Sequence, residues 1–429
     1  MQKIKDIILD KLGHLYRSGA FHIIGGNFAT KFVTFFGSIV IVRLLSKHDY
    51  GILGYVENLY SIAYIFAGLG MSNAILRFVV LGKDIDEKYS YYCYMKRRAM
   101  VSNIIIIGIF ICIAFLYPHP SKFTGASILL TIYMLQLPFQ YRFDNDLMLE
   151  RAMFENKKYA YMAFGAVLIT VIAKCLGAII DGVLGAIVVV AASYMIMSAC
   201  TAYKQKIRFK NATAFDIEIG KKKEIDIYSF QYMITNGMWS LFMLTDVFLM
   251  GKLSGNPAAL ADYKVAYVWP GNIGVVVSAI AIFITPYFIQ HENDHAWVRH
   301  GFKKLILVNV AIVGSMAVLM IIFARPLIFI YAGDEYMNTV SLMRILVVPA
   351  FINNALRATV ANILAAMGQV KYNMVISMCG IIMEVIIDII MIPRYGGFGI
   401  AIAGIINYSM MFIAVFAVFS KKYELFSSK

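Results

Sequence analysis

Long apolar blocks recur along almost the whole of this chain, and each is long enough to cross a lipid bilayer. A helix needs about 20 predominantly apolar residues to span a hydrocarbon core of roughly 30 Å. Hydrophobic residues make up 60% of the 429 residues, and charged residues make up only 15%. Soluble domains are closer to about half apolar and about a quarter charged. The sequence therefore predicts an all-α integral membrane protein.

Twelve transmembrane helices are predicted, separated by short loops or turns. They lie at about 20–44, 51–79, 99–117, 124–142, 159–180, 183–203, 226–251, 263–289, 303–324, 340–366, 371–392 and 397–420. Ahead of them, Ile and Leu within residues 3–16 recur at helical spacing opposite charged residues, which predicts a helix lying in the membrane interface. A disordered charged tail is the alternative for that segment.

Lysine and arginine concentrate in the loops on one side of the predicted membrane helices. That side carries both chain ends, the segment 83–98 and the longest loop, 204–225, whereas few cations fall on the other side. Because loops rich in Lys and Arg stay in the cytoplasm, we predict that both termini are cytoplasmic. The same rule accounts for the net charge of +14, and no nucleic-acid-binding module is visible between the helices.

The two halves of the chain repeat the same pattern. A GxxG motif opens the sixth predicted helix at Gly182 and the twelfth at Gly396, 214 positions later. The residues before the fifth and eleventh helices match at the same spacing, which argues against chance similarity between apolar helices. We therefore predict two similar six-helix bundles, 1–203 and 226–429, joined by the basic linker 204–225 and enclosing a central cleft.

Polar residues form a continuous stripe on the first predicted helix. A charge near the bilayer centre costs several kcal/mol unless it faces water or a partner, so such residues are candidate functional groups. The stripe, at i, i+4, i+7 and i+11, consists of Asn27, Lys31, Thr34 and Ser38. It predicts a substrate-binding surface facing the cleft. A structural ion pair of Lys31 with Asp246 or Glu57 is the alternative.

Other intramembrane charges are further candidates. Glu57 and Asp246 are the predicted ion-coupling carboxylates. Lys174 lies within the fifth helix, away from the predicted cleft helices. Arg43 and Lys264 lie nearer the membrane surface, where a long side chain can instead extend its charge into water.

Two charges in the second half are predicted to neutralise each other. Arg344 and Asp388 each lie about five residues from the external end of their helix, so they are expected at equal depth. An ion pair between them would satisfy both charges inside the membrane. A transport role for these residues is the alternative.

Signatures of enzymes and metal sites are missing from the sequence. It contains no GxxxxGK[ST] phosphate-binding loop, no HExxH and no GxSxG. The five cysteines are scattered without metal-ligand spacing. We therefore expect no catalytic residues, no cofactor and no resident metal, with a monovalent cation or proton gradient as the available energy source.

Four segments carry a family resemblance. They are 42–46 (VRLLS), 48–51 (HDYG), 67–78 (AGLGMSNAILRF) and 246–252 (DVFLMGK). Together with the GxxG starts of the sixth and twelfth helices, they resemble the polysaccharide transporter, or O-antigen flippase, family. That family belongs to the multidrug/oligosaccharidyl-lipid/polysaccharide exporter superfamily, and the likeness covers nearly the whole chain.

The resemblance implies a flippase of the bacterial cytoplasmic (inner) membrane. Its substrate would be a polyprenyl-diphosphate-linked oligosaccharide, the repeat unit of O-antigen in lipopolysaccharide, of capsule or of exopolysaccharide. Ion-coupled alternating access would move it from the cytoplasmic to the outer leaflet. The cations that could bind the diphosphate are Lys31, Arg43, Lys174 and Lys264. Membrane lipids, a polysaccharide polymerase and chain-length proteins are the expected partners.

Two other functions compete with the flippase. A cation-coupled multidrug antiporter of the same superfamily would need a cleft dominated by carboxylates, whereas the predicted cleft carries both signs of charge. A membrane-embedded polymerase or glycosyltransferase would need a sizeable external loop, and the predicted external loops are short.

Overall fold

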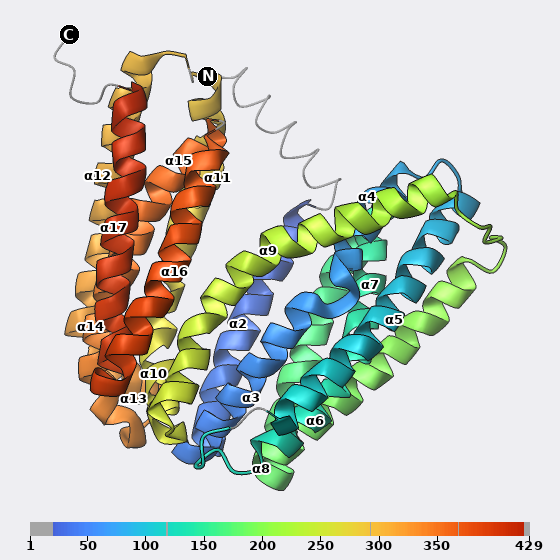
Figure 1. Cartoon of the computed structure of the whole chain (residues 1–429), viewed down its shortest axis with the longest axis horizontal. Coiled ribbons are helices and arrows are strands. Elements are labelled where there is room, and N and C mark those ends of the chain that lie inside the picture. The colour runs from blue at the N-terminus through green and yellow to red at the C-terminus, as the bar shows by residue number, and fades with distance from the viewer. Residues whose placement is uncertain (1–19, 117–118, 292, 368, 424–429) are drawn as a thin grey trace. The chain divides into compact units, whose positions relative to one another are not determined.

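The computed structural model describes residues 20–116, 119–291, 293–367 and 369–423, and within this part of the chain every regular element is a helix (Figure 1). The predicted interfacial helix 3–16 lies outside the described residues. The all-helical class follows from the apolar composition, because a chain in lipid must satisfy its backbone hydrogen bonds internally.

The first half of the chain forms long helices with few interruptions. Its elements are α2 (Ala20–Leu44), α3 (Lys47–Phe66), η1 (Ala67–Gly70), α4 (Met71–Leu81), α5 (Ile85–Leu116), α6 (Ala126–Met134), α7 (Leu137–Ala152), α8 (Asn156–Arg208) and α9 (Ile219–Ser254).

The second half contains more short helical segments. Its elements are α10 (Pro257–Asn272), α11 (Gly274–Gln290), α12 (His295–Ile322), α13 (Ala324–Ala332), η2 (Asp334–Thr339), α14 (Val340–Phe351), η3 (Ile352–Ala358), α15 (Thr359–Ala366), α16 (Val370–Tyr395) and α17 (Gly397–Tyr423).

Seven helices among the described residues are long and apolar enough to cross a membrane. This confirms the membrane-protein fold class, and the number of twelve transmembrane helices stays a prediction.

Several predicted spans do not form one helix each. The span 124–142 is divided between α6 and α7, and the span 263–289 between α10 and α11, which meet just after Pro270. Proline removes a backbone donor and disturbs the turn before it.

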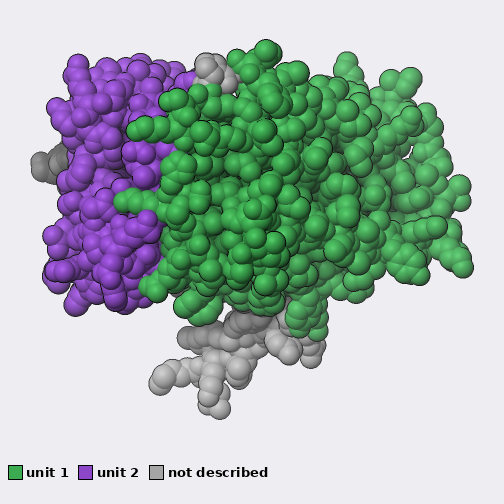
Figure 2. Space-filling view, turned by 90° about the horizontal axis from the view of Figure 1, so that it is seen from below, with its two compact units in different colours: residues 1–244 green, residues 245–429 purple. Residues whose placement is uncertain are grey.

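The described chain divides into two compact units, residues 1–244 and 245–429, coloured separately in Figure 2. We call them unit 1 and unit 2. The division differs from the predicted bundles 1–203 and 226–429, because the helix α9 continues across Leu244 and its first part belongs to unit 1. The role of 204–225 as a linker between bundles stays a prediction.

The helix α8 folds back on itself at the predicted turn 181–182. Asp181 has φ −151° and ψ 45°, and Gly182 has φ 51° and ψ −128°, so neither is helical. A Cβ atom added to Gly177 would lie 2.2 Å from the carbonyl oxygen of Gly185. Residues eight positions apart in a continuous helix would be about 12 Å apart along its axis. The fifth and sixth predicted spans are therefore packed backbone to backbone within α8.

The same turn occurs between α16 and α17. Gly396 has φ 55° and ψ −132°, close to the values of Gly182, 214 positions earlier. A Cβ atom added to Gly399 would lie 2.5 Å from the carbonyl oxygen of Met391. The predicted repeat is thus present in backbone geometry as well as in the GxxG motif.

Replacing Gly177 with Ala should destabilise the protein by about 1–3 kcal/mol, the usual cost of forcing an extra carbon into a packed site. The added methyl would overlap the backbone of Gly185, which has no flexible side chain to move aside. Gly108→Ala is the control, because nothing lies within 4 Å of a Cβ at that position. Thermal unfolding in detergent should separate the two variants, and equal melting temperatures would contradict this packing.

The predicted second span contains a sharp break within the family-like segment 67–78. Gly68, Leu69 and Gly70 have φ values of 57°, 48° and 80°, so η1 interrupts the helix between α3 and α4. The amide of Gly68 donates to Asn103 Oδ1 at 2.6 Å. A backbone group freed by the break therefore finds a partner on α5.

Candidate functional site

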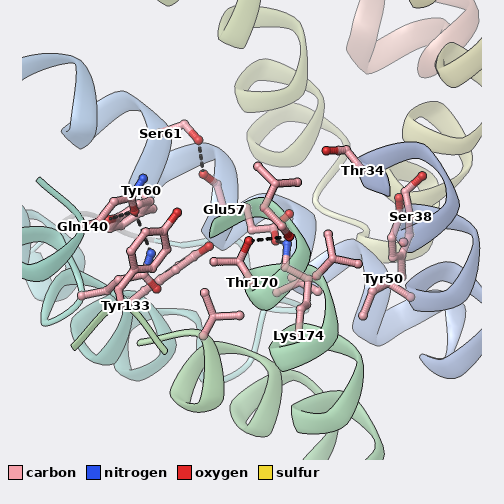
Figure 3. A pocket seen from close by; sticks show the side chains of 18 residues that line it. Thr34, Ser38, Tyr50, Glu57, Tyr60, Ser61, Tyr133, Gln140, Thr170 and Lys174 are labelled. Carbon is pink, nitrogen blue, oxygen red and sulfur yellow. Dashed lines mark hydrogen bonds and ion pairs between the residues drawn. The ribbon is translucent and has the colours of Figure 1, made fainter. Parts of the chain in front are cut away.

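A cavity of about 410 Å³ lies within unit 1, between α2, α3, α6, α7 and α8 (Figure 3). We call it the unit 1 pocket. Its polar and aromatic lining consists of Thr34, Ser38, Tyr50, Glu57, Tyr60, Ser61, Tyr133, Gln136, Gln140, Thr170, Lys174 and Tyr194. A cavity of this size, with a few charged groups among aromatic and apolar walls, has the properties of a small-molecule binding site.

An ion pair crosses the unit 1 pocket. Lys174 Nζ on α8 lies 2.5 Å from Glu57 Oε1 on α3, and Figure 3 shows the two side chains pointing toward each other. Their side chains are 30% and 24% exposed, so both remain accessible from the cavity. The alternative pair of Glu57 with Lys31 is not found among the described residues, where Lys31 is exposed on α2. The pocket therefore presents both signs of charge in one place.

Aromatic and amide side chains form the opposite wall of the unit 1 pocket. The rings of Tyr60 and Tyr133 are stacked with centroids 4.2 Å apart. Tyr60 Oη and Gln136 Nε2 each donate to Gln140 Oε1 at 2.8 Å. This wall offers a ring surface with hydrogen-bonding groups beside it, which is suited to a polar ring such as a sugar.

The polar stripe on α2 lies only partly in the pocket. Thr34 and Ser38 line it, and their hydroxyl groups donate to backbone oxygens of α2 at 2.9 and 2.7 Å. Lys31 and Arg43 are exposed and do not line the pocket. Asn27 lies in α2, but its side chain is outside the described part of the structure.

Asp144 is a carboxylate that the sequence analysis did not single out. It accepts a hydrogen bond from Tyr64 Oη, and both residues line a second cavity of about 270 Å³ in unit 1. The fourth span was predicted to end at 142, which placed Asp144 in a loop. Instead, α7 continues to Ala152. The helical spacing of Tyr141, Asn145 and Met148 was the available signal for this continuation.

Unit 2 contains a separate group of acidic side chains. Asp246 on α9 accepts a hydrogen bond from Tyr263 Oη at 3.1 Å, and Glu384 on α16 accepts one from Asn407 Nδ2 at 2.9 Å. Asp246 and Asp388 both interact electrostatically with Glu384. We call Asp246, Glu384 and Asp388 the unit 2 carboxylates. They do not converge into a metal cage, since no group of three or more metal-ligand side chains is found among the described residues.

The predicted ion pair of Arg344 with Asp388 is wrong. Arg344 is exposed on α14 and donates to the carbonyl oxygen of Ile321 at 3.2 Å. Asp388 is 0% exposed, and neither of its carboxylate oxygens has a hydrogen-bond partner in the described structure. Arg344 and Asp388 lie at similar depth along their helices, but their side chains do not face each other. Lys264, the last predicted substrate cation, lies on α10 in unit 2 and is half-buried.

Sequence comparison identifies the family. The profile described as "Polysaccharide biosynthesis protein" matches residues 40–341, well over half of the chain. The chain belongs to this family. The match confirms the resemblance found in the sequence. A search of curated protein sequences found no match to the chain.

Solved structures similar to this polysaccharide biosynthesis protein are membrane transporters. An inward-facing multidrug resistance MATE family transporter of the MOP superfamily has a TM-score of 0.70 at 14% identity, covering 93% of this chain and 96% of its own. The lipid II flippase MurJ, in an inward closed conformation, has a TM-score of 0.67 at 14% identity over 93% and 87% of the two chains. The Vibrio cholerae MATE transporter VcmN has a TM-score of 0.60 at 14% identity over 97% and 99%. At these identities the likeness establishes the transporter fold.

Proposed function

We propose that this protein is a flippase for a polyprenyl-diphosphate-linked oligosaccharide. It would move the repeat unit of O-antigen, capsule or exopolysaccharide from the cytoplasmic to the outer leaflet of the bacterial inner membrane. The observation that carries this proposal is the unit 1 pocket of a polysaccharide biosynthesis protein, with its Lys174–Glu57 pair beside a wall of stacked tyrosines. A flippase moves its substrate across the membrane without breaking or forming a covalent bond, so the proposed function requires no catalytic residue.

The chemistry of the pocket suits the proposed substrate. Sugar hydroxyls would bind Gln140, Ser38 and Thr34, and sugar rings would stack on Tyr60 and Tyr133. The diphosphate would compete with Glu57 for Lys174, because a doubly charged group attracts an ammonium more strongly than one carboxylate does. Lys31, Arg43 and Lys264 are the further proposed phosphate-binding cations, with Asn27 as a hydrogen-bonding neighbour on α2.

The proposed driving force is a gradient of protons or a monovalent cation. Asp246 and Glu57 are the carboxylates proposed from the sequence, and the burial of Asp388 without a partner adds this residue to the proposal. A buried carboxylate cannot remain charged and unpartnered without a large free-energy cost. Binding and releasing a proton or cation at the unit 2 carboxylates would therefore switch the charge of unit 2.

Deletion of the gene in its host tests the proposed function. A flippase defect should leave completed lipid-linked oligosaccharides on the cytoplasmic side and remove surface polysaccharide. Extraction of the lipid-linked pool and staining of the cell surface measure the two effects. An unchanged lipid pool with normal surface glycan would contradict the proposal.

A cation-coupled multidrug antiporter is the second candidate, favoured by the similarity to MATE transporters and by the unit 2 carboxylates. The deletion strain separates the two functions, because loss of an antiporter should sensitise cells to cationic drugs without changing surface glycan. The proposed polymerase and chain-length partners would be sought by cross-linking in the same host.

Replacing Lys31 with Ala should abolish surface polysaccharide when the variant complements the deletion strain. Lys31 is exposed on α2, and no described carboxylate lies within ion-pairing distance of it, so its charge is available to a phosphate. Its removal should leave folding intact, since surface substitutions usually change stability by less than about 0.5 kcal/mol. Lys47→Ala, just beyond the same helix, is the control. Normal polysaccharide from a membrane-inserted Lys31→Ala protein would remove Lys31 from the site.

A further inference from the structure

A third cavity in unit 1, of about 590 Å³, is lined by cations from segments far apart in the sequence. Lys96 comes from α5, Arg142 from α7, Lys206 from the end of α8, and Lys210 from the segment that follows it. None of these residues lines the unit 1 pocket. We call this cavity the basic pocket. It lies at the end of the helices where the Lys- and Arg-rich segments meet.

The carboxylates near the basic pocket already have hydrogen-bond or ion-pair partners. Asp146 accepts hydrogen bonds from the hydroxyl groups of Tyr92 and Thr201, the latter at 2.5 Å. Glu150 is paired with Arg208 at 2.6 Å. None of the four pocket cations forms an ion pair within the described part of the chain. The basic pocket therefore has an excess of positive charge.

The inner cations share one carboxylate. Asp146 interacts electrostatically with both Lys96 and Arg142, and this single negative charge does not neutralise the four pocket cations. Arg142 is half-buried, and its Nε atom is buried without a hydrogen-bond partner among the described residues. The ammonium group of Lys96 lies 5.4 Å from the centre of the Tyr92 ring, and Tyr92 is itself 2% exposed. A buried guanidinium nitrogen left unsatisfied costs free energy, which an acceptor entering the pocket would recover. Lys206 and Lys210 are exposed and would meet the same anion at the pocket mouth.

An apolar stripe leads from the basic pocket along the outside of α8. Its members, at i, i+4, i+7 and i+11, are Ile196, Cys200, Tyr203 and Ile207. Tyr203 lines the pocket and is 68% exposed, and Ile196 and Ile207 are 61% and 57% exposed. A soluble anion would not need this surface, whereas an acyl chain would lie along it.

We propose that the basic pocket binds the phosphate headgroup of an anionic phospholipid, with the acyl chains lying along the exposed stripe of α8. Basic pockets between membrane helices on the cytoplasmic side are suited to such headgroups, because they combine cations with access from the bilayer. The bound lipid would connect α5, α7 and the end of α8 by bridging their cations. This binding is separate from transport of the oligosaccharide.

Lipid retention measures the proposed binding. The purified full-length protein is placed in nanodiscs of phosphatidylcholine containing a small fraction of phosphatidylglycerol, and co-purifying lipid is counted by native mass spectrometry. Lys206→Gln/Lys210→Gln should weaken retention of phosphatidylglycerol by roughly fivefold for each cation removed. Both residues are exposed, so this variant should fold. Arg142→Gln should weaken retention further, and its melting temperature is measured in parallel.

The matched control is Arg97→Gln/Lys204→Gln, which removes the same charge from exposed positions of α5 and α8 outside the pocket. Retention by this control should equal that of the wild type. Equal losses in both double variants would show a diffuse charge effect and overturn the site. Inorganic phosphate at millimolar concentration could displace phosphatidylglycerol. If phosphatidylglycerol also binds no more tightly than phosphate does, the pocket binds a soluble anion and the lipid proposal is overturned. Displacement by an equimolar polyprenyl diphosphate would reassign it to the transport substrate.

Discussion

Replacing Lys174 with Met is expected to destabilise the protein by about 2 kcal/mol and to abolish transport. The substitution leaves Glu57 without its partner inside the unit 1 pocket. Removing one member of a fully buried pair costs about 3–5 kcal/mol, and the cost here is lower because both side chains are partly exposed to the cavity. Thermal unfolding in detergent and recovery of surface polysaccharide in the deletion strain measure the two effects.

The double variant Glu57→Gln/Lys174→Met separates a structural role from substrate binding. It removes both charges together, so the stability lost in the single variant should largely return. Transport should stay absent, because the ammonium group proposed to bind the diphosphate is gone. Lys158→Met is the control on the same helix, since it breaks an exposed pair with Glu155 that is worth at most about 1 kcal/mol. Wild-type transport by the double variant would show that the pair only stabilises the fold.

Replacing Asp388 with Asn should make transport independent of the ion gradient while the protein still folds. Asn has almost the same shape as Asp and cannot exchange a proton or bind a cation through a negative charge. The change in stability should stay within about 1 kcal/mol, because the variant also avoids the cost of a buried charge without a partner. The measurement is flipping in proteoliposomes under imposed H⁺, Na⁺ or K⁺ gradients.

Asp334→Asn is the control for this experiment, since Asp334 is exposed in η2. It should respond to each gradient as the wild type does. A gradient response that survives in the Asp388→Asn variant would exclude Asp388 from coupling. In that case Asp246 and Glu384 would be replaced in the same way, because they complete the unit 2 carboxylates.

The helical class and the reversal of the chain at 181–182 could be predicted because they depend on local sequence. Apolar length determines what can lie in a membrane, and GxxG at Gly182 marks a tight turn between small residues. The contact between Glu57 and Lys174 could not be predicted in this way. These residues are 117 positions apart, and helical spacing shows which residues share a face without showing which helices are neighbours. Lys174 was therefore placed apart from the residues that it contacts.

The burial of Asp388 shows the same limit. Its depth along α16 was predicted well enough to suggest a pair with Arg344, but pairing also requires that the two side chains face each other. Arg344 is exposed and Asp388 is fully enclosed, so they point into different environments. Similarly, Asp144 was missed because the end of a helix is set by contacts beyond the apolar block, and α7 continues past the predicted end.

The matching turns at Gly182 and Gly396 place Lys174 and Asp388 at equivalent positions of the two repeats, 214 residues apart. One position of the repeat therefore carries a cation in the first half of the chain and an anion in the second. Two identical repeats would carry the same charge twice and would favour a single class of ligand. Under the proposed function, this difference would let the first repeat bind the anionic cargo and the second bind the cation that drives transport.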